Sequence, residues 1–192
     1  GNSERVSRNS EAAYHALNVA SNVILSSFSL SFIVVLMIIV YSSKSGSSKQ
    51  YAEILSEHTG IPAYAVGSEP KGEPVVFFGW LRKDTVIGLN RIERSDLHAV
   101  CVVGLDDERR FSKDAIRKRN AVNVPIYYLR GWIDRSKLNI IDKTVLNVVS
   151  AVMKIKGLNQ YNQPIFDAMM EGGSFFDEKY LEPVEPFLKG TM

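Results

Sequence analysis

Short runs of consecutive apolar residues alternate with segments of helical spacing along residues 37–192. An apolar run rich in β-branched side chains is typical of a strand covered on both faces. Five such runs predict strands at 37–43, 62–68, 73–80, 98–105 and 124–131. Apolar stripes with capping serines and terminal glycines predict helices at 47–60, 112–120, 140–157 and 177–190.

This alternation predicts an α/β domain, a doubly wound parallel sheet of five strands with helices on both faces. The connection between the runs at 62–68 and 73–80 is too short for a normal crossover, which needs a dozen or more residues. We therefore expect the second helix to be missing and the strand at 62–68 to be a reduced edge. Ligands of such sheets bind beyond the carboxyl ends of the strands.

Residues 1–36 do not continue this pattern. The uncharged run 22–41 has the nominal length of a membrane span, about 20 residues. Serines dilute its first half, and its last residues belong to the first predicted strand. We interpret residues 1–36 as an extension outside the domain, such as a tag remnant or translated upstream sequence, and 37–192 as the domain. An ordered extra strand or helix and a membrane anchor are the alternatives.

Composition narrows the function classes. The chain is 45% hydrophobic and 23% charged, which is globular. Its single cysteine, Cys101, excludes an internal disulfide and fits a cytoplasmic protein with an inert core thiol. The net charge of +2 is too even to indicate nucleic-acid binding. The three histidines lack ligand spacing, so we expect no metal site.

The loop after the first predicted strand is rich in hydroxyl groups. Serines surround Gly46 between a buried strand and the start of a helix. Free backbone N–H groups and the helix dipole favour an anion at such a place, and a glycine lets the backbone approach it. The alternative is a flexible serine-rich linker that merely caps the helix.

The segment YSSKSGSSKQYAEIL resembles the phosphate loop of flavodoxins, in which hydroxyl residues occupy fixed positions around one glycine. In that family the loop binds the phosphate of FMN. The matching positions and the variable positions between them are Ser43, Lys44, Ser45, Gly46, Ser47 and Ser48.

The resemblance covers residues 37–190. FFGWLRKDTVIGLNRI and VGLDDERRF resemble the second and third flavin loops. YYLRGWIDRSKLNIIDKTVLNVV and EGGSFFDEKYLEPVEPFLKG resemble a branch of flavodoxin-domain proteins akin to menaquinone-dependent protoporphyrinogen oxidase. The resemblance implies the flavodoxin-like strand order 2-1-3-4-5, with a helical insertion after the fifth strand.

A flavin ring needs an apolar or aromatic face and hydrogen bonds at its edge. The residues that leave the third and fourth strands towards such a ring are Trp80, Leu81, Arg82, Gly104, Leu105 and Asp106. Trp80 is the candidate for stacking, or else a core tryptophan. We expect the carboxylates of Asp106 and Asp107 to point away from a reduced flavin or to cap the next helix. Arg109 and Arg110 are surface charges or face an acidic substrate.

The helix at 140–157 carries an apolar stripe, with lysines Lys154 and Lys156 at its end. We interpret the stripe as packing against the domain. A dimer interface or a peripheral membrane contact is the alternative, because basic residues beside an apolar face suit a lipid boundary. The stripe consists of Ile141, Val145, Val148, Val149 and Val152.

Three functions follow from these observations. The first is an FMN-binding electron-transfer protein, which serves a redox partner protein or a quinone and contributes no catalytic acid or base. The second is a quinone-dependent flavoenzyme like protoporphyrinogen oxidase, with Arg82, Arg110 and Arg130 meeting substrate carboxylates. The third is a flavodoxin-like binding module that has lost the cofactor. The visible spectrum of the pure protein separates the third from the others.

Overall fold

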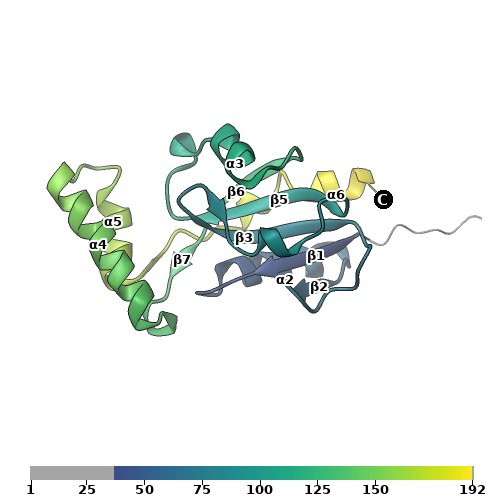
Figure 1. Cartoon of the computed structure of the whole chain (residues 1–192), viewed down its shortest axis with the longest axis horizontal. Helices are drawn as coiled ribbons and strands as arrows, with labels where there is room; N and C mark the ends of the chain where they lie inside the picture. The colour runs from purple at the N-terminus through teal and green to yellow at the C-terminus, as the bar shows by residue number, and fades with distance from the viewer. Residues whose placement is uncertain (1–36, 192) are drawn as a thin grey trace, which may run out of the picture. The chain divides into compact units, whose positions relative to one another are not determined.

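A mostly parallel sheet forms the centre of the computed structural model, which describes residues 37–191 (Figure 1). The predicted α/β class is therefore confirmed, and the expectations for residues 1–36 lie outside the described residues. A sixth, antiparallel strand, β4 (Thr85–Val86), pairs with the end of β3. In spatial order the five parallel strands are β2 (Ala63–Ala65), β1 (Ile38–Ser42), β3 (Val75–Arg82), β5 (Leu97–Gly104) and β6 (Ile126–Arg130).

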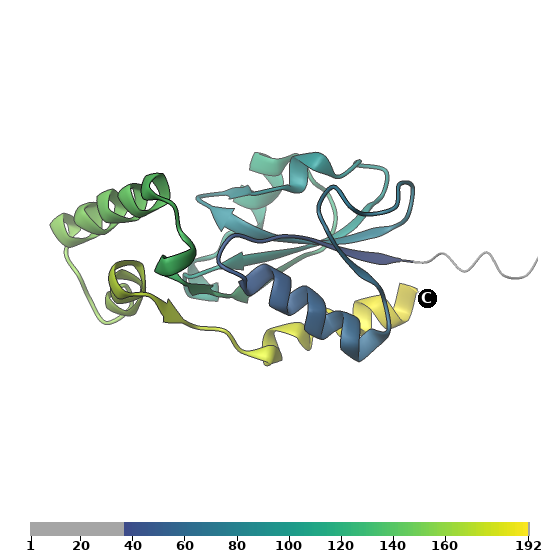
Figure 2. The same cartoon turned by 90° about the horizontal axis from the view of Figure 1, so that it is seen from below.

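The apolar runs form strands because both faces of the sheet are covered. Successive side chains point to opposite faces, so Phe77 and Phe78 enter two different core clusters. On one face α2 (Ser47–Thr59) and α6 (Glu185–Thr191) supply Tyr51 and Leu188. On the other face α3 (Lys113–Asn120) supplies Ile116. Figure 2 shows α2 and α6 together beneath the sheet.

The second crossover helix is absent between β2 and β3, where residues 66–74 form turns and irregular structure. The edge strand β2 is only three residues long, shorter than the run that predicts it. An edge strand pairs on one side only, so polar and glycine residues after Ala65 shorten it readily. This part of the sheet follows the sequence-based expectation.

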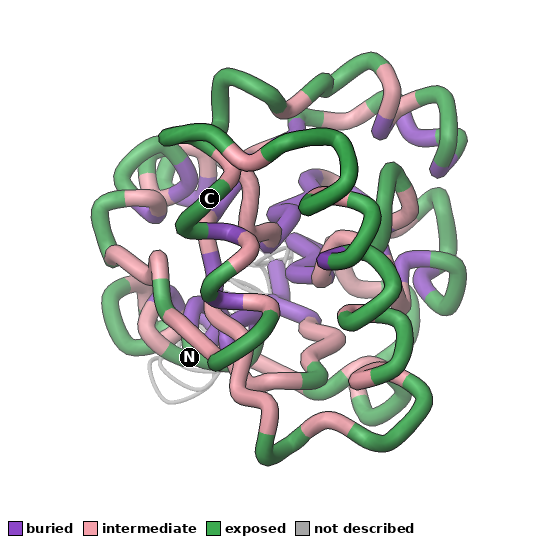
Figure 3. Tube along the Cα trace, turned by 90° about the vertical axis from the view of Figure 1, so that its left-hand side faces the viewer, coloured by how far each residue is buried: buried purple, intermediate pink, exposed green. Residues whose placement is uncertain are grey.

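A helical insertion follows β6 and returns to the sheet through a short two-stranded ribbon. The ribbon pairs β7 (Trp132–Ile133) with β8 (Gly173–Ser174), and between them lie α4 (Ile140–Lys156) and α5 (Gln163–Glu171). The two helices pack on each other beyond the carboxyl ends of the strands (Figure 1). Figure 3 looks onto this end and shows a largely exposed outer layer in front of the buried strands.

The apolar stripe of α4 corrects the sequence-based interpretation, because it does not pack against the domain. Val148 is 58% exposed and Ile141 72% exposed, whereas the buried position of the helix is Ser150. The insertion projects from the sheet, so only part of the α4 surface finds a neighbour. The helix is nevertheless well capped, since the Asn139 side chain accepts a hydrogen bond from the backbone N–H of Asp142.

The C-terminal segment differs from the single helix expected at 177–190. It forms a 3₁₀ turn at Glu178–Leu181 and then α6. Pro183 lies between them and has no backbone N–H to donate, so the run of helical hydrogen bonds is interrupted there. In residues 37–191 there is no helix that combines the length and the apolarity needed to cross a membrane.

Candidate functional site

The loop between β1 and α2 presents unused hydrogen-bond donors at the carboxyl edge of the sheet. Gly46 is the N-cap of α2 with φ +112°, and no side chain caps this helix end. The first N–H groups of a helix have no intrahelical partner. The hydroxyl oxygens of Ser43 and Ser48 are also buried, and neither has a hydrogen-bond partner among residues 37–191. The loop therefore offers backbone and hydroxyl donors that the protein itself does not satisfy.

Trp132 of β7 holds this loop through two reciprocal hydrogen bonds. Its indole Nε1 donates to the carbonyl oxygen of Ser45 at 2.9 Å, and the Ser45 hydroxyl donates to the carbonyl oxygen of Trp132 at 3.0 Å. In a planar trans peptide the next N–H, that of Gly46, points opposite to this carbonyl. Trp132 thus fixes the direction of one loop donor. It was not among the residues that the sequence singled out.

A cation and a carboxylate join the same loop to the insertion. Lys44 forms an ion pair with Asp142 in the first turn of α4. The Lys44 ammonium also lies 5.9 Å from the centre of the Trp80 ring, within the range of a cation–π contact. Lys44, the only cation in the loop between β1 and α2, therefore contacts both the insertion and the loop that follows β3.

The second candidate loop is a hairpin. β3 runs through Trp80, Leu81 and Arg82 and turns back into β4, with Lys83 at the tip in the left-handed region at φ 54°. Trp80 is half-buried, Leu81 packs partly against the core, and Arg82 is exposed. The Asn120 side chain of α3 stabilises the hairpin by accepting from the Val86 N–H and donating to the Asp84 carbonyl.

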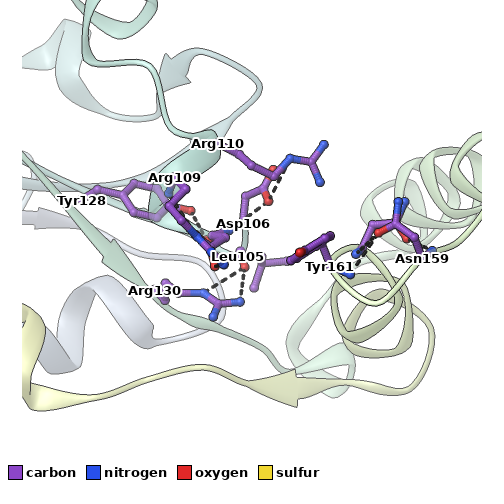
Figure 4. Close-up of polar contacts among 10 residues, drawn as sticks. Leu105, Asp106, Arg109, Arg110, Tyr128, Arg130, Asn159 and Tyr161 are labelled. Atoms are coloured by element: carbon purple, nitrogen blue, oxygen red, sulfur yellow. Dashed lines mark hydrogen bonds and ion pairs between the residues drawn. The ribbon is translucent and has the colours of Figure 1, made fainter.

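The third loop, at Gly104, Leu105 and Asp106, is held by two side chains of β6 (Figure 4). The Tyr128 hydroxyl donates to the Asp106 carbonyl at 2.9 Å. The Arg130 guanidinium donates to the Leu105 carbonyl at 2.9 Å. Burial raises the pKa of Tyr128, so its hydroxyl remains a protonated donor at neutral pH.

The charged residues after this loop are mostly engaged with one another. Asp107 caps the next 3₁₀ turn, as expected, by accepting from the Arg109 N–H. Hydrogen bonds from the Arg109 side chain and backbone lower the pKa of the Asp107 carboxyl. Arg110 lies 3.7 Å from Asp106 (Figure 4), and Arg130 stacks 4.0 Å from the centre of the Phe175 ring.

A cavity of about 630 Å³ lies where the three loops face the insertion. This volume is within the range of small-molecule sites. Of the predicted residues it brings together Lys44, Ser45, Ser47, Trp80, Leu81, Arg82, Gly104 and Leu105. The predicted residues outside its wall are Ser43, Gly46, Ser48 and Asp106. The wall residues that the sequence did not indicate include Lys83, Trp132, Leu138, Thr144, Leu146 and Met169.

The charged residues of the cavity wall favour an anionic ligand. They are Lys44, Arg82, Lys83 and Asp142, which is three cations against one carboxylate. In residues 37–191 no three His, Cys, Asp or Glu side chains cluster as metal ligands would. Cys101 is fully buried in β5, and burial raises the pKa of its thiol, which removes it as a nucleophile.

No protein-family model matches the chain, and no curated protein is significantly similar to it.

Proposed function

We propose that this protein binds FMN and transfers electrons, as flavodoxins do. The observation that carries the proposal is the uncapped start of α2 beside two buried, unpartnered serine hydroxyls. A phosphate supplies the acceptors that these donors lack, and it complements the positive end of the helix dipole. The residues present therefore fit the phosphate end of FMN.

The topology supports the same proposal. The crossover from β1 leads to β2 on one side, and the connection from β2 leads to β3 on the other side of β1, so the strand order reverses at β1. Ligands of open α/β sheets bind at such a point of reversal, outside the carboxyl ends of the strands. The order β2-β1-β3-β5-β6 is consistent with the flavodoxin-like order 2-1-3-4-5 when the small strand β4 is left out of the numbering, and this supports the proposal.

Each loop has a distinct role in this proposal. The serine hydroxyls and the first N–H groups of α2 hold the phosphate. Trp80 offers an aromatic face to the flavin ring, and the backbone of Gly104 and Leu105 offers hydrogen bonds at its edge. When bound, the flavin accepts and releases electrons, while the protein orients it and sets its potential through stacking and local charge.

A second candidate function is oxidation of an acidic substrate by a flavoenzyme like quinone-dependent protoporphyrinogen oxidase. Arg82 favours it, because its guanidinium, at the cavity wall, has no hydrogen bond or ion pair within residues 37–191. Arg110 and Arg130 favour it less, because both already have partners. Arg110 forms an ion pair with Asp106, and Arg130 donates a hydrogen bond to the Leu105 carbonyl. Turnover of protoporphyrinogen with a quinone acceptor tests this candidate. If no turnover is measured, electron transfer remains the proposed function.

The Gly46→Val variant tests the phosphate loop. A Cβ at residue 46 lies 3.2 Å from the Trp132 ring on a backbone of positive φ, so we expect the loop to deform. FMN affinity should fall at least about tenfold, a loss of about 1.4 kcal/mol, when followed by flavin fluorescence or the visible spectrum.

Gly60→Val is the matched control at the other end of α2. Gly60 also has positive φ, at +73°, but a Cβ there meets nothing within 4 Å. We expect this variant to lose some stability and to keep its FMN affinity. Equal affinities for FMN in the two variants and the parent protein contradict the proposed phosphate site.

A further inference from the structure

A stripe of exposed aliphatic side chains runs along α4, and we call it the α4 stripe. Ile141, Val148, Val152 and Ile155 recur at helical spacing and so lie on one side of the helix. A contiguous exposed apolar surface of this kind marks an interaction site in most proteins. The complete α4 stripe is Ile140, Ile141, Val145, Val148, Val149, Val152 and Ile155.

The α4 stripe is continuous with the candidate cavity. Val145, Val148 and Val149 belong both to the stripe and to the cavity wall. The remaining members lie outside the cavity wall, with Ile155 85% exposed near the free end of the helix. Whatever covers the stripe therefore lies against the mouth of the cavity.

The free charges of α4 are positive. Lys156 flanks the stripe, Lys143 and Lys154 lie on the polar side of the helix, and the single carboxylate already pairs with Lys44. Arg82 and Lys83 add two cations at the cavity wall. None of these five cations forms an ion pair within the part of the chain that the structure describes. The partner that complements this surface is both apolar and anionic.

A second copy of the chain complements the stripe poorly. A second copy offers the same cations near its own stripe, Lys156, Arg82 and Lys83, and no free carboxylate of α4 to complement them. Protein-binding surfaces are also typically anchored by aromatic side chains. The stripe contains only aliphatic residues, whereas the surface of an anionic bilayer offers both acyl chains and negative head groups.

We propose that α4 docks on the surface of an anionic lipid bilayer, with the α4 stripe in the acyl boundary and its lysines at the head groups. An amphipathic helix lies in the plane of the interface in this way, and lysine side chains extend to keep their ammonium groups in water. This proposal does not depend on FMN. It places the mouth of the cavity at the membrane surface.

Vesicle co-sedimentation of the full chain tests the proposal. We expect the protein to bind vesicles of phosphatidylcholine containing about one third phosphatidylglycerol, and to bind pure phosphatidylcholine less well. The Ile141→Asn/Ile155→Asn variant should bind the anionic vesicles at least about tenfold less, because each aliphatic side chain contributes through the apolar area that it buries. Both residues are strongly exposed and outside the cavity wall, so folding and FMN binding should persist.

Met170→Asn is the control, since Met170 is an exposed apolar residue of α5 outside the stripe. Lys154→Gln/Lys156→Gln should remove most of the preference for anionic vesicles. Undiminished vesicle binding by the Ile141/Ile155 variant overturns the proposal and assigns the binding to another segment. A parent protein that stays in solution, or that forms a dimer abolished by the same variant, overturns it as well. Flavin spectra of each variant report separately on the proposed cofactor site.

Discussion

Ser43 and Ser48 have hydroxyl oxygens that are buried without a partner among residues 37–191, although burial of an unsatisfied polar group is costly. In the proposed FMN complex each hydroxyl donates to a phosphate oxygen, which removes this cost. Trp132 fixes the Ser45 carbonyl and is itself part of the cavity wall. At the scale of single residues, the serine hydroxyls are the proposed donors to the ligand, and Trp132 positions the loop that carries them.

Trp132→Phe should weaken FMN binding and leave riboflavin binding nearly unchanged. The substitution removes the indole donor to the Ser45 carbonyl, and a hydrogen bond of this kind contributes about 1 kcal/mol, or about fivefold in affinity. Only the phosphate end of the ligand depends on this loop. Fluorescence titration with both flavins measures the ratio.

Tyr128→Phe is the control for this prediction. It removes a comparable hydrogen bond, from the Tyr128 hydroxyl to the Asp106 carbonyl, at the loop proposed for the flavin ring. We expect any loss of affinity to be equal for FMN and riboflavin. An equal loss for both flavins in the Trp132 variant shows that Trp132 has a general structural role instead.

The elements of the sheet could be predicted because each strand is a continuous apolar run, and burial on both faces requires that pattern. The serine-rich loop at Gly46 could be placed between a strand and a helix, whereas its binding of phosphate stays a prediction. β7 and β8 could not be predicted, since two-residue strands carry no periodic signal. The contact between Ser45 and Trp132 joins residues 87 positions apart, and no local pattern records it.

The exposure of the apolar stripe of α4 could not be predicted either, for a different reason. Apolar residues at helical spacing predict a buried face, but they do not specify what covers it. The insertion meets the sheet through the β7–β8 ribbon, and α4 packs mainly on α5. The sequence therefore predicts the helix and its apolar side, whereas the exposure of that side follows from tertiary structure.

At the level of elements, Asn120→Ala should destabilise the hairpin of β3 and β4. The Asn120 side chain is buried and bonds to Val86, Asp84 and Ile116, so its loss leaves backbone groups unsatisfied. We expect the free energy of unfolding to fall by about 1–3 kcal/mol in urea denaturation. The hairpin carries Trp80 and Arg82 to the cavity, so its loosening should also weaken flavin binding.

Arg119→Ala is the matched variant on the same helix. The Arg119 side chain donates to the hydroxyl of Thr85, but this contact is exposed to solvent. Exposed substitutions of this kind usually change stability by less than about 0.5 kcal/mol. Similar losses of stability in the two variants argue against Asn120 as the support of the hairpin.

At the scale of the whole molecule, the cavity needs both the sheet and the insertion. The loops after β1, β3 and β5 form one side, and β7, α4 and α5 form the other. The ion pair of Lys44 with Asp142 and the bonds of Trp132 with Ser45 join the two sides. The loop between β1 and α2 is therefore shaped by residues that lie far along the chain, in a part of the fold that also carries the α4 stripe.

Titration of the purified full chain with FMN and with riboflavin tests the central claim most directly. The account predicts FMN binding at or below micromolar concentration, with riboflavin bound at least about tenfold more weakly because it lacks the phosphate. The bound flavin should give visible bands shifted from those of the free molecule. A colourless protein that does not bind added FMN at micromolar concentration, or that binds both flavins equally, contradicts the account.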